Sequence, residues 1–188
     1  MTKRIIVGIT GASGAPLAHR VLELMRDLDV EVHLLLSKWG MRLIESETPW
    51  SPDDFYSMAK VVHKQGELGA SISSGSYRTD GMVIVPCSMK TLASVRTGAS
   101  DNLVARAADV VIKEGRKLVL VPRECPMSPI HLENMLALAK IGVTILPPVL
   151  GFYYRPTSID DMVTHLACRV LDQFGLEHPE ATRWGGGM

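Results

Sequence analysis

Short apolar segments alternate with longer amphipathic segments along most of the chain. The apolar segments, such as IIVGI, MVIVP and KLVLVP, contain few polar residues. Continuous apolar runs of this length are typical of strands that are buried on both faces of a sheet. They predict strands over residues 4–10, 31–37, 81–86, 117–122 and 143–147. The remaining segments predict helices over residues 15–27, 38–46, 52–63, 88–97, 102–115, 129–141 and 158–174.

Regular alternation of strands and helices predicts an α/β protein with a parallel, doubly wound sheet. The length of 188 residues suits one domain with a substantial core, so residues 1–188 are interpreted as a single domain. Residues 48–79 are rich in serine, glycine and polar residues, which indicates a short helix and a long functional loop. The tail from about residue 175 has little periodicity.

Composition and charge narrow the function classes. Twenty basic residues balance twenty acidic ones, which argues against a general affinity for nucleic acid or membranes. Three widely spaced cysteines, Cys87, Cys125 and Cys168, indicate a reducing compartment, and the six histidines lack the spacing of zinc ligands. Residues 1–10 fit a buried strand better than a signal peptide, and no apolar run reaches membrane-spanning length. We therefore expect a cytoplasmic protein without a metal site.

Ligands of open α/β sheets bind at the carboxyl ends of the strands, so the residues that follow each strand carry the most information. The first strand ends in Gly8-Ile-Thr-Gly11-Ala-Ser13-Gly14, where glycines allow a close backbone approach to an anion at a helix N-terminus. The spacing is not G-x-G-x-x-G, the second strand ends in Ser37 rather than an acid, and the chain has no P-loop motif. Dinucleotide and nucleoside triphosphate sites are therefore disfavoured.

Hydroxyl side chains follow three of the expected strands, at Ser13, Ser37, and the pair Ser88 and Thr91. Neutral donors together with backbone amides suit a single phosphate on a larger ring system, as in FMN. The alternative interpretation is that Ser88 and Thr91 only cap their own helix, and for either residue alone this is the better explanation. Three strand ends that each offer a hydroxyl are the stronger signal.

Charged residues after the fourth strand and in the helix before that strand leave alternatives open. Arg123 and Glu124 follow the fourth strand and are candidates for phosphate binding and proton transfer, or for an ordinary surface ion pair. Arg106, Asp109 and Lys113 share one helix face, a pattern that more often marks a solvated stripe than a site. For Arg106, burial and a role between subunits are equally good explanations.

The loop after the fifth strand reads PPVLGFYYRP. Core packing capped by aromatic residues is the default interpretation. An apolar wall with a phenol directed at an anion is the alternative. Pattern alone assigns no role to Arg169 or Trp184, and His33 is interpreted as a histidine within a strand.

Taken together, the motifs GITGASGA, LLLSKWG, DGMVIVPCSMKTL, RAADVVIKE, LVLVPRECP, HLENMLALA, ILPPVLGFYYRP and RVLDQFGL resemble the UbiX/Pad family of flavin prenyltransferases. The resemblance extends from about residue 4 to Trp184. It implies a flavodoxin-like Rossmann fold, which is a three-layer sandwich, and assembly into a homododecamer. It also implies transfer of a dimethylallyl group from dimethylallyl phosphate to N5 and C6 of reduced FMN, without a metal. The prenylated FMN would serve a separate UbiD-type decarboxylase of aromatic acids.

The resemblance also assigns roles to individual residues. The residues that it places at the flavin are Gly11, Ala12, Ser13, Ser37, Ser88, Met89, Lys90, Thr91 and Arg123. Those that it places at dimethylallyl phosphate are Arg106, Lys113, Tyr153, Arg169 and Trp184, with Arg106 expected from a neighbouring subunit. Its catalytic candidates are Ser13 and Glu47 for the C6 proton, and Lys113 and Glu124 for the departing phosphate.

The chain departs from the family pattern at Gly115, where an arginine is frequent, at Cys125, and in a shorter loop before SSGS. Two other functions stay open at this point. A non-catalytic FMN-binding partner of a decarboxylase would leave Glu47 and Lys113 without a role. An oxidative decarboxylase of the phosphopantothenoyl-cysteine type would need a histidine near the flavin, and no histidine occurs in a strand-end motif.

Overall fold

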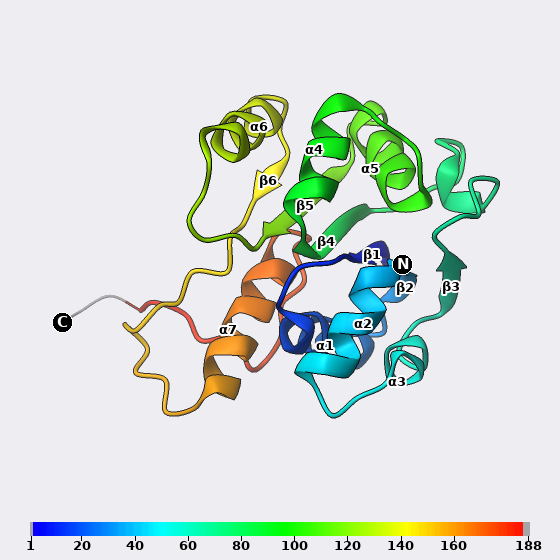
Figure 1. The fold of residues 1–188 in the computed structure, drawn as a ribbon. Coiled ribbons are helices and arrows are strands. Elements are labelled where there is room, and N and C mark those ends of the chain that lie inside the picture. The colour runs from blue at the N-terminus through cyan, green and yellow to red at the C-terminus, as the bar shows by residue number, and fades with distance from the viewer. Residues whose placement is uncertain (1, 186–188) are drawn as a thin grey trace.

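The chain forms a parallel sheet, which we describe from a computed structural model that covers residues 2–185 (Figure 1). The strands lie in the order β3-β2-β1-β4-β5-β6. Every neighbouring pair is parallel. The bounds of the strands are β1 Arg4–Ile9, β2 Glu31–Leu36, β3 Val61–Lys64, β4 Gly81–Cys87, β5 Lys117–Pro122 and β6 Thr144–Ile145. The expected doubly wound α/β sheet is confirmed.

Helices cover both faces of the sheet and make a three-layer sandwich. Their bounds are α1 Ala15–Asp27, α2 Lys38–Glu47, α3 Pro52–Tyr56, α4 Met89–Thr97, α5 Leu103–Lys113, α6 Pro129–Lys140 and α7 Ile159–Asp172, with a short 3₁₀ turn at Ser71–Ser73. In Figure 1, α1, α2 and α7 lie on one side of the sheet and α4, α5 and α6 on the other.

Side chains of β1 alternate between the two cores that this arrangement creates. Val7 packs in the core under α1 and α7, whereas Ile6 packs in the core under α4 and α5. Both side chains are almost fully buried. Burial on both faces explains why the central strands read as continuous apolar runs in the sequence.

One strand was missed by the sequence analysis. The helix expected over residues 52–63 ends at Tyr56, and Val61–Lys64 forms the edge strand β3. This strand buries only His63 well, so it lacks the apolar run of a central strand. The strand expected over residues 143–147 is limited to Thr144–Ile145, because the prolines that follow have no N–H to continue the ladder.

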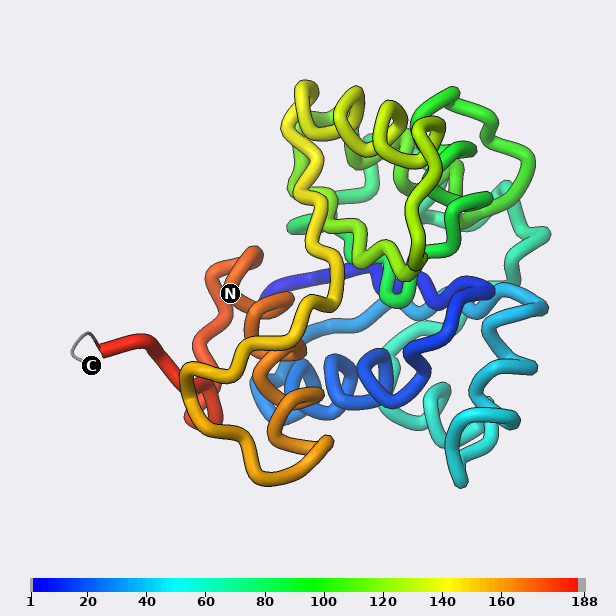
Figure 2. The backbone as a smooth tube through the Cα atoms, turned by 60° about the vertical axis from the view of Figure 1, so that its left-hand side comes forward, coloured from blue at the N-terminus to red at the C-terminus, as the bar shows by residue number. Residues whose placement is uncertain are grey.

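The chain leaves the sheet after β6 and returns through α7. Residues 146–158 form a loop that extends away from the sheet, and the tail after α7 runs back beside this loop (Figures 1 and 2). The ammonium group of Lys3 donates a hydrogen bond to the carbonyl of Phe174. Because Lys3 precedes β1, the end of α7 lies at the amino edge of the sheet, and α7 therefore starts towards the carboxyl edge. None of the helices in residues 2–185 has the length and apolarity needed to cross a membrane.

Gly81 sits at the start of β4 in a conformation that only glycine adopts readily. Its φ is +153°, and an added Cβ would lie 2.5 Å from the carbonyl oxygen of Lys117. We expect Gly81→Ala to reduce the free energy of unfolding by about 1–3 kcal/mol, because the alanine would be strained and would push β4 away from β5. Chemical denaturation measures the loss. Gly69→Ala, at a site with open space around the Cβ, is the control and should change stability little; an equal effect of both variants would contradict this account.

Candidate functional site

Two cavities lie next to each other at the carboxyl edge of the sheet. The first, of about 310 Å³, is lined mainly by polar residues, and we call it the polar cavity. The second, of about 480 Å³, is lined mainly by apolar residues, and we call it the apolar cavity. Gly11 lines the polar cavity, whereas Ser13 and Gly14 line the apolar one. The loop after β1 therefore separates them, so one elongated ligand with an anionic end and an apolar end could occupy both.

Three helices begin at the polar cavity. Ser37 caps α2 by accepting a hydrogen bond from Gly40 N (3.0 Å), and Ser88 caps α4 by accepting one from Thr91 N (3.2 Å). Asn102 caps α5 in the same way, through Ala105 N (3.1 Å). All three capping residues line the cavity. Since each helix N-terminus carries a partial positive charge, their convergence favours an anion such as a phosphate.

Two lysines add full positive charge to the polar cavity. Lys38 and Lys90 both line it, and each is the first or second residue of a helix that begins there. The capping interpretation of Ser88 is confirmed, and it is compatible with anion binding because the cap orients the helix end towards the cavity.

Close packing of the loop after β1 against α2 requires glycine at position 11. A Cβ added there would lie 2.7 Å from the Cβ of Trp39. The loop backbone can therefore lie directly against the side chain at the second position of α2.

Glu47 binds the N-terminus of α1 from the end of α2. Its Oε2 accepts hydrogen bonds from the backbone N–H groups of Gly14 (2.8 Å) and Ala15 (3.0 Å). Burial by itself would raise the pKa of Glu47, but these two N–H donors, the Ser13 side chain and the charge of Arg123 outweigh it and hold the pKa below its usual value. An ionised carboxylate therefore lines the apolar cavity beside Ser13.

The two charged residues after β5 have different surroundings. Arg123 lines the apolar cavity, and its backbone N–H donates to the carbonyl of Cys87 (3.3 Å) at the end of β4. Glu124 is turned back on its own loop, where Oε1 accepts a hydrogen bond from Cys125 N (3.1 Å). Arg123 thus contacts the candidate site, and Glu124 lies one residue away from it.

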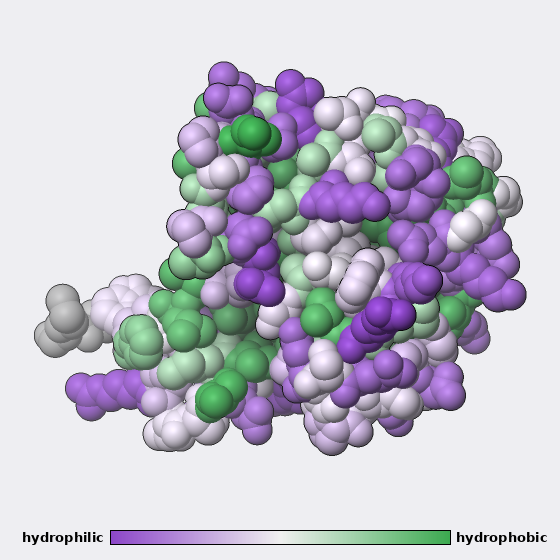
Figure 3. Space-filling model, in the orientation of Figure 1, coloured by the Kyte–Doolittle hydropathy of each residue, from purple (hydrophilic) through white to green (hydrophobic). Residues whose placement is uncertain are grey.

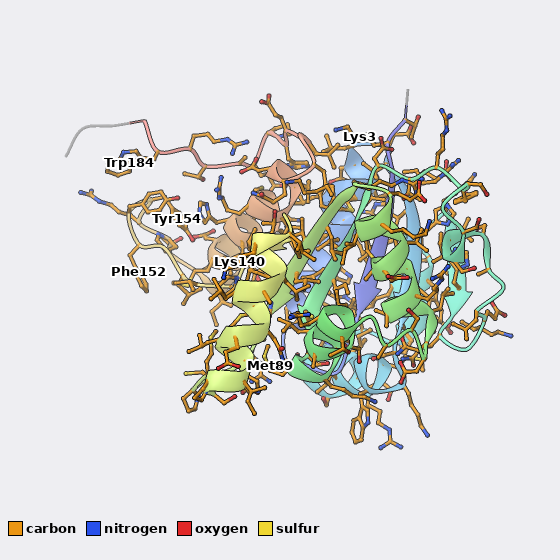
Figure 4. The ribbon with its side chains drawn as sticks, turned by 90° about the horizontal axis from the view of Figure 1, so that it is seen from above. Lys3, Met89, Lys140, Phe152, Tyr154 and Trp184 are labelled. Atoms are coloured by element: carbon orange, nitrogen blue, oxygen red, sulfur yellow. The ribbon has the colours of Figure 1, made fainter. Side chains whose placement is uncertain are left out.

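Most of the expected flavin-binding residues come together at this edge. Those that line a cavity are Gly11, Ser13, Ser37, Ser88, Lys90, Thr91 and Arg123. Ala12 is buried, and in the loop it stands between Gly11, which lines the polar cavity, and Ser13, which lines the apolar cavity. The Met89 side chain packs against the core under α4. Figure 4 shows Met89 at the carboxyl edge and Lys3 at the opposite edge of the sheet.

The structure does not bring Arg106 and Lys113 to the cavities of the same chain. Arg106 lies within α5, where it donates to the carbonyl of Ser73 (3.2 Å) and pairs with Asp109 (2.8 Å). Lys113 ends α5 and pairs with Glu114 (2.5 Å), four residues before β5 begins at Lys117. Lys113 therefore lies at the amino edge, about one strand length, or ~20 Å, from the cavities.

Tyr153, Arg169 and Trp184 lie on the loop after β6, on α7 and on the tail after α7, respectively. The Tyr153 hydroxyl contacts His165 of α7 (3.1 Å), and the Trp184 ring packs edge-on against Tyr153 at 5.5 Å. Arg169, one turn beyond His165, pairs with Asp172 (2.7 Å). Figure 4 shows Phe152, Tyr154 and Trp184 beside α7, to one side of the sheet. None of the three lines either cavity.

Sequence reasoning missed several residues that line the cavities. In the polar cavity these are Lys38, Trp39, Gln65 and Asn102; in the apolar cavity they include Pro148, Ile159, Val163 and Leu166. Gln65 was missed because it directly follows β3, the strand that the pattern did not predict. Four of the others could be predicted from the sequence. Asn102 precedes a predicted helix, and Ile159, Val163 and Leu166 recur on one face of another.

Neither cavity offers a metal centre. Across residues 2–185, no group of three or more histidine, cysteine, aspartate or glutamate side chains is arranged to hold a metal ion. No histidine lines the two cavities either. Residues at the cavities therefore supply hydroxyls, backbone amides, lysines, one arginine and one carboxylate.

Comparison with known proteins gives one consistent result. The model of the family described as "Flavoprotein" matches residues 1–168. The chain is 58% identical to a probable UbiX-like flavin prenyltransferase of Escherichia coli O157:H7, over 97% of this chain and 93% of that protein. It is 50% identical to flavin prenyltransferase LpdB of Lactiplantibacillus plantarum, over 98% of this chain and 99% of that protein.

Solved structures agree with these relatives. A dodecameric FMN-dependent UbiX-like decarboxylase from Escherichia coli O157:H7 has a TM-score of 0.96 and 58% identity, covering 97% of this chain and all of that one. The protein AnUbiX, in complex with FMN and dimethylallyl pyrophosphate, has a TM-score of 0.98 and 46% identity, with both chains covered completely.

Ionised Glu47 should make stability depend on pH. Because its pKa is lower in the folded than in the unfolded chain, its contribution is fully present above the unfolded value of about 4.3 and is lost as pH falls through the folded value. We expect Glu47→Gln to lower the free energy of unfolding by about 1 kcal/mol at pH 7. The difference from the wild type should shrink steadily below about pH 4. Denaturation at a series of pH values measures it.

Glu45→Gln, at an exposed position of the same helix, is the matched control and should cost little at any pH. A Glu47→Gln effect that is the same at pH 7 and at low pH would show that the carboxylate does not stabilise α1 by its charge.

Proposed function

This chain belongs to the UbiX-like flavin prenyltransferases of the flavoprotein family, and from that membership we propose which parts of the chain carry out the reaction. The protein transfers a dimethylallyl group to FMN and so makes prenylated FMN, the cofactor of UbiD-type decarboxylases of aromatic acids. The observation that carries the proposal is the pair of adjoining cavities at the carboxyl edge, one polar and placed at three helix N-termini, the other apolar with an ionised carboxylate.

We assign the FMN phosphate to the polar cavity. Three helix N-termini, Lys38 and Lys90 supply positive charge there, and the Thr91 hydroxyl supplies a further donor. The loop of Gly11, Ala12 and Ser13 then lies between this phosphate and the apolar cavity, where the flavin ring and the prenyl chain would avoid water. Reduced FMN supplies electron-rich N5 and C6 atoms that accept the prenyl carbons.

The residues of the apolar cavity suit the proton transfer that this reaction needs. Forming a bond at C6 requires removal of the proton on that carbon. The carboxylate of Glu47 is ionised and adjoins Ser13, so we assign the two residues to accepting this proton. The apolar wall, which includes Val121 and Leu166, excludes water that would otherwise capture an allylic cation.

Departure of phosphate from the donor requires cations, because a monophosphate without a metal is a poor leaving group. Arg123 is the cation in the apolar cavity of the same chain. We assign Glu124, the next residue, to protonating the departing phosphate once it turns away from Cys125 N. We propose dimethylallyl phosphate as the donor, whereas AnUbiX was solved with the diphosphate.

Further phosphate ligands come, in our proposal, from other copies of the chain. Arg106 and Lys113 lie along α5, and Tyr153, Arg169 and Trp184 gather beside α7, so one copy cannot close the site with them. A dodecameric relative with a TM-score of 0.96 supports an assembly in which these groups meet. We propose the same homododecamer for this protein.

Exposed apolar side chains agree with such an assembly. Val149, Leu150, Phe152 and Ile159 are all between 47% and 78% exposed. Figure 3 shows an apolar region where the loop after β6 meets α7. Apolar patches of this kind mark interaction surfaces.

We also propose a cytoplasmic location. The charge balance and the cysteines support it: Cys87 and Cys168 are buried thiols, and Cys125 is an exposed one. The competing decarboxylase function loses support, because the cavities contain no histidine.

Prenyl transfer can be tested directly on the purified protein. FMN, dithionite and dimethylallyl phosphate are added anaerobically, and the extracted flavin is analysed by mass spectrometry. We expect a flavin that is heavier by one prenyl unit and that does not form without protein. Unmodified FMN from folded, flavin-loaded protein, with dimethylallyl diphosphate also inactive, would contradict the function and would favour a non-catalytic FMN-binding partner.

A site built from several copies predicts complementation. Ser13→Ala and Lys113→Ala should each retain FMN and lose most of their turnover. Each substitution removes a side chain that we assign to the transfer reaction and leaves the lining of the polar cavity unchanged. Assemblies refolded from equal amounts of both variants should recover about one quarter of the sites, since each group is intact in about half of the copies. Product formation per bound FMN measures the recovery.

Ser13→Ala mixed with Glu47→Gln is the matched control. These two residues line the same cavity of one chain, so no mixed site contains both groups intact and no activity should return. Recovery in the control, or none with Lys113→Ala, would show that the site is not divided between copies as proposed.

A further inference from the structure

A tyrosine and a histidine form a hydrogen-bonded pair beside α7. The Tyr153 hydroxyl lies 3.1 Å from Nε2 of His165. His165 is 6% exposed. Its other ring nitrogen, Nδ1, is the one buried side-chain nitrogen or oxygen in residues 2–185 that has no hydrogen-bond partner. No sequence motif singled out His165, and the mechanism above does not use it.

Aromatic contacts fix the orientation of this pair. The Tyr154 ring stacks on His165 with a centroid distance of 4.3 Å and an interplanar angle of 25°. The Tyr153 ring meets His165 edge-on at 5.7 Å, and Trp184 meets Tyr153 edge-on at 5.5 Å. The imidazole therefore presents Nε2 to Tyr153 and keeps Nδ1 inside the protein.

The unpartnered Nδ1 decides the direction of the hydrogen bond. If the phenol donated to Nε2, neutral His165 would carry its proton on Nδ1, as a buried donor with nothing to accept it. If Nε2 carries the proton, Nδ1 is only a bare acceptor, which is the less costly defect, because orphaned buried N–H groups are rarer than unpaired acceptors. The stable arrangement is therefore Nε2–H donating to the oxygen of Tyr153.

We propose that His165 is a positioning residue that turns Tyr153 into a donor for the phosphate of the prenyl substrate. The phenol oxygen accepts from His165, so its own proton is free to point outwards to an anion. His165 Nε2–H then donates to the Tyr153 oxygen, and the Tyr153 O–H donates to a phosphate oxygen. In such a chain each hydrogen bond polarises the next. The inference rests on the function proposed above, in which Tyr153 contacts that phosphate.

The same pair brings two phosphate ligands together. His165 and Arg169 lie four residues apart on one face of α7, so the tyrosine held at His165 lies about one helical turn from the position of Arg169. A hydroxyl donor and a cation at this spacing suit a single phosphate group.

His165 stays neutral, as this arrangement requires. Burial lowers the pKa of His165, and the charges of Arg169 and Arg183 lower it further, while Asp172 opposes them. The other titratable groups that contact the ring are the phenols of Tyr153 and Tyr154.

Two variants separate the hydrogen bond from the packing. His165→Phe keeps a ring to stack on Tyr154 but removes the Nε2–H donor. His165→Gln keeps an amide donor near the position of Nε2. For His165→Phe we expect KM for dimethylallyl phosphate to rise about three- to tenfold with kcat unchanged, because a hydrogen bond present in both the bound state and the transition state is lost. His165→Gln should stay close to the wild type.

Tyr153→Phe tests whether the effect passes through the phenol. Adding His165→Phe to Tyr153→Phe should cause no further rise in KM. Binding of dimethylallyl phosphate to the protein loaded with oxidised FMN, measured by calorimetry, should show the same pattern, and equal melting temperatures would show that all variants fold.

The proposal is overturned if His165→Phe binds the donor as tightly as the wild type, if His165→Gln is impaired as much as His165→Phe, or if the effect persists without the Tyr153 hydroxyl. The calorimetric result decides it even if the wild type forms no prenylated flavin. Failure of the pair and failure of the transferase function are therefore distinguishable.

Discussion

A buried hydroxyl cross-links the ends of the two central strands. Thr10, which is 2% exposed, donates its hydroxyl proton to the carbonyl of Pro86 (2.8 Å) and accepts from the backbone N–H of Ser88 (2.9 Å). β1 and β4 lie where the chain reverses its direction across the sheet, and ligands of open α/β folds bind at such a point. Residues at and after the ends of these two strands line both cavities, so this cross-link joins the two segments from which the candidate site is built.

The sequence predicts the elements that a local pattern defines, and it does not predict contacts between residues that lie far apart along the chain. Central strands such as Lys117–Pro122 are apolar on both faces, so a local pattern is enough to find them. β3 is a half-exposed edge strand and has no such pattern. Glu47 reaches Gly14 across 33 residues, a contact that no spacing rule reveals. The family resemblance singled out Glu47, but for a proton of the flavin and not for this contact. The family resemblance places Lys113 at the substrate, yet α5 carries it to the opposite edge of the sheet in the same copy.

Separate parts of one chain therefore carry separate tasks. In the proposed function, the carboxyl edge provides an anion site and a carboxylate, while α5 and the α7 face would provide additional phosphate ligands at places that one copy does not bring together. Such a division links assembly to chemistry. A free copy would then bind flavin yet offer only Arg123 to the leaving group, so allylic chemistry would not begin before assembly added further cations and closed the site to water.

The contact between Lys3 and Phe174 has a practical consequence for handling the protein. It places the start of β1 and the end of α7 together at the edge of the sheet that faces away from both cavities. A fluorescent label, surface linker or fusion partner joined ahead of Lys3 would therefore extend away from the cavities of its own copy. The same group joined beyond Trp184 would follow directly after a side chain that packs on Tyr153, so labelling through the amino-terminal side leaves that contact of its own copy undisturbed.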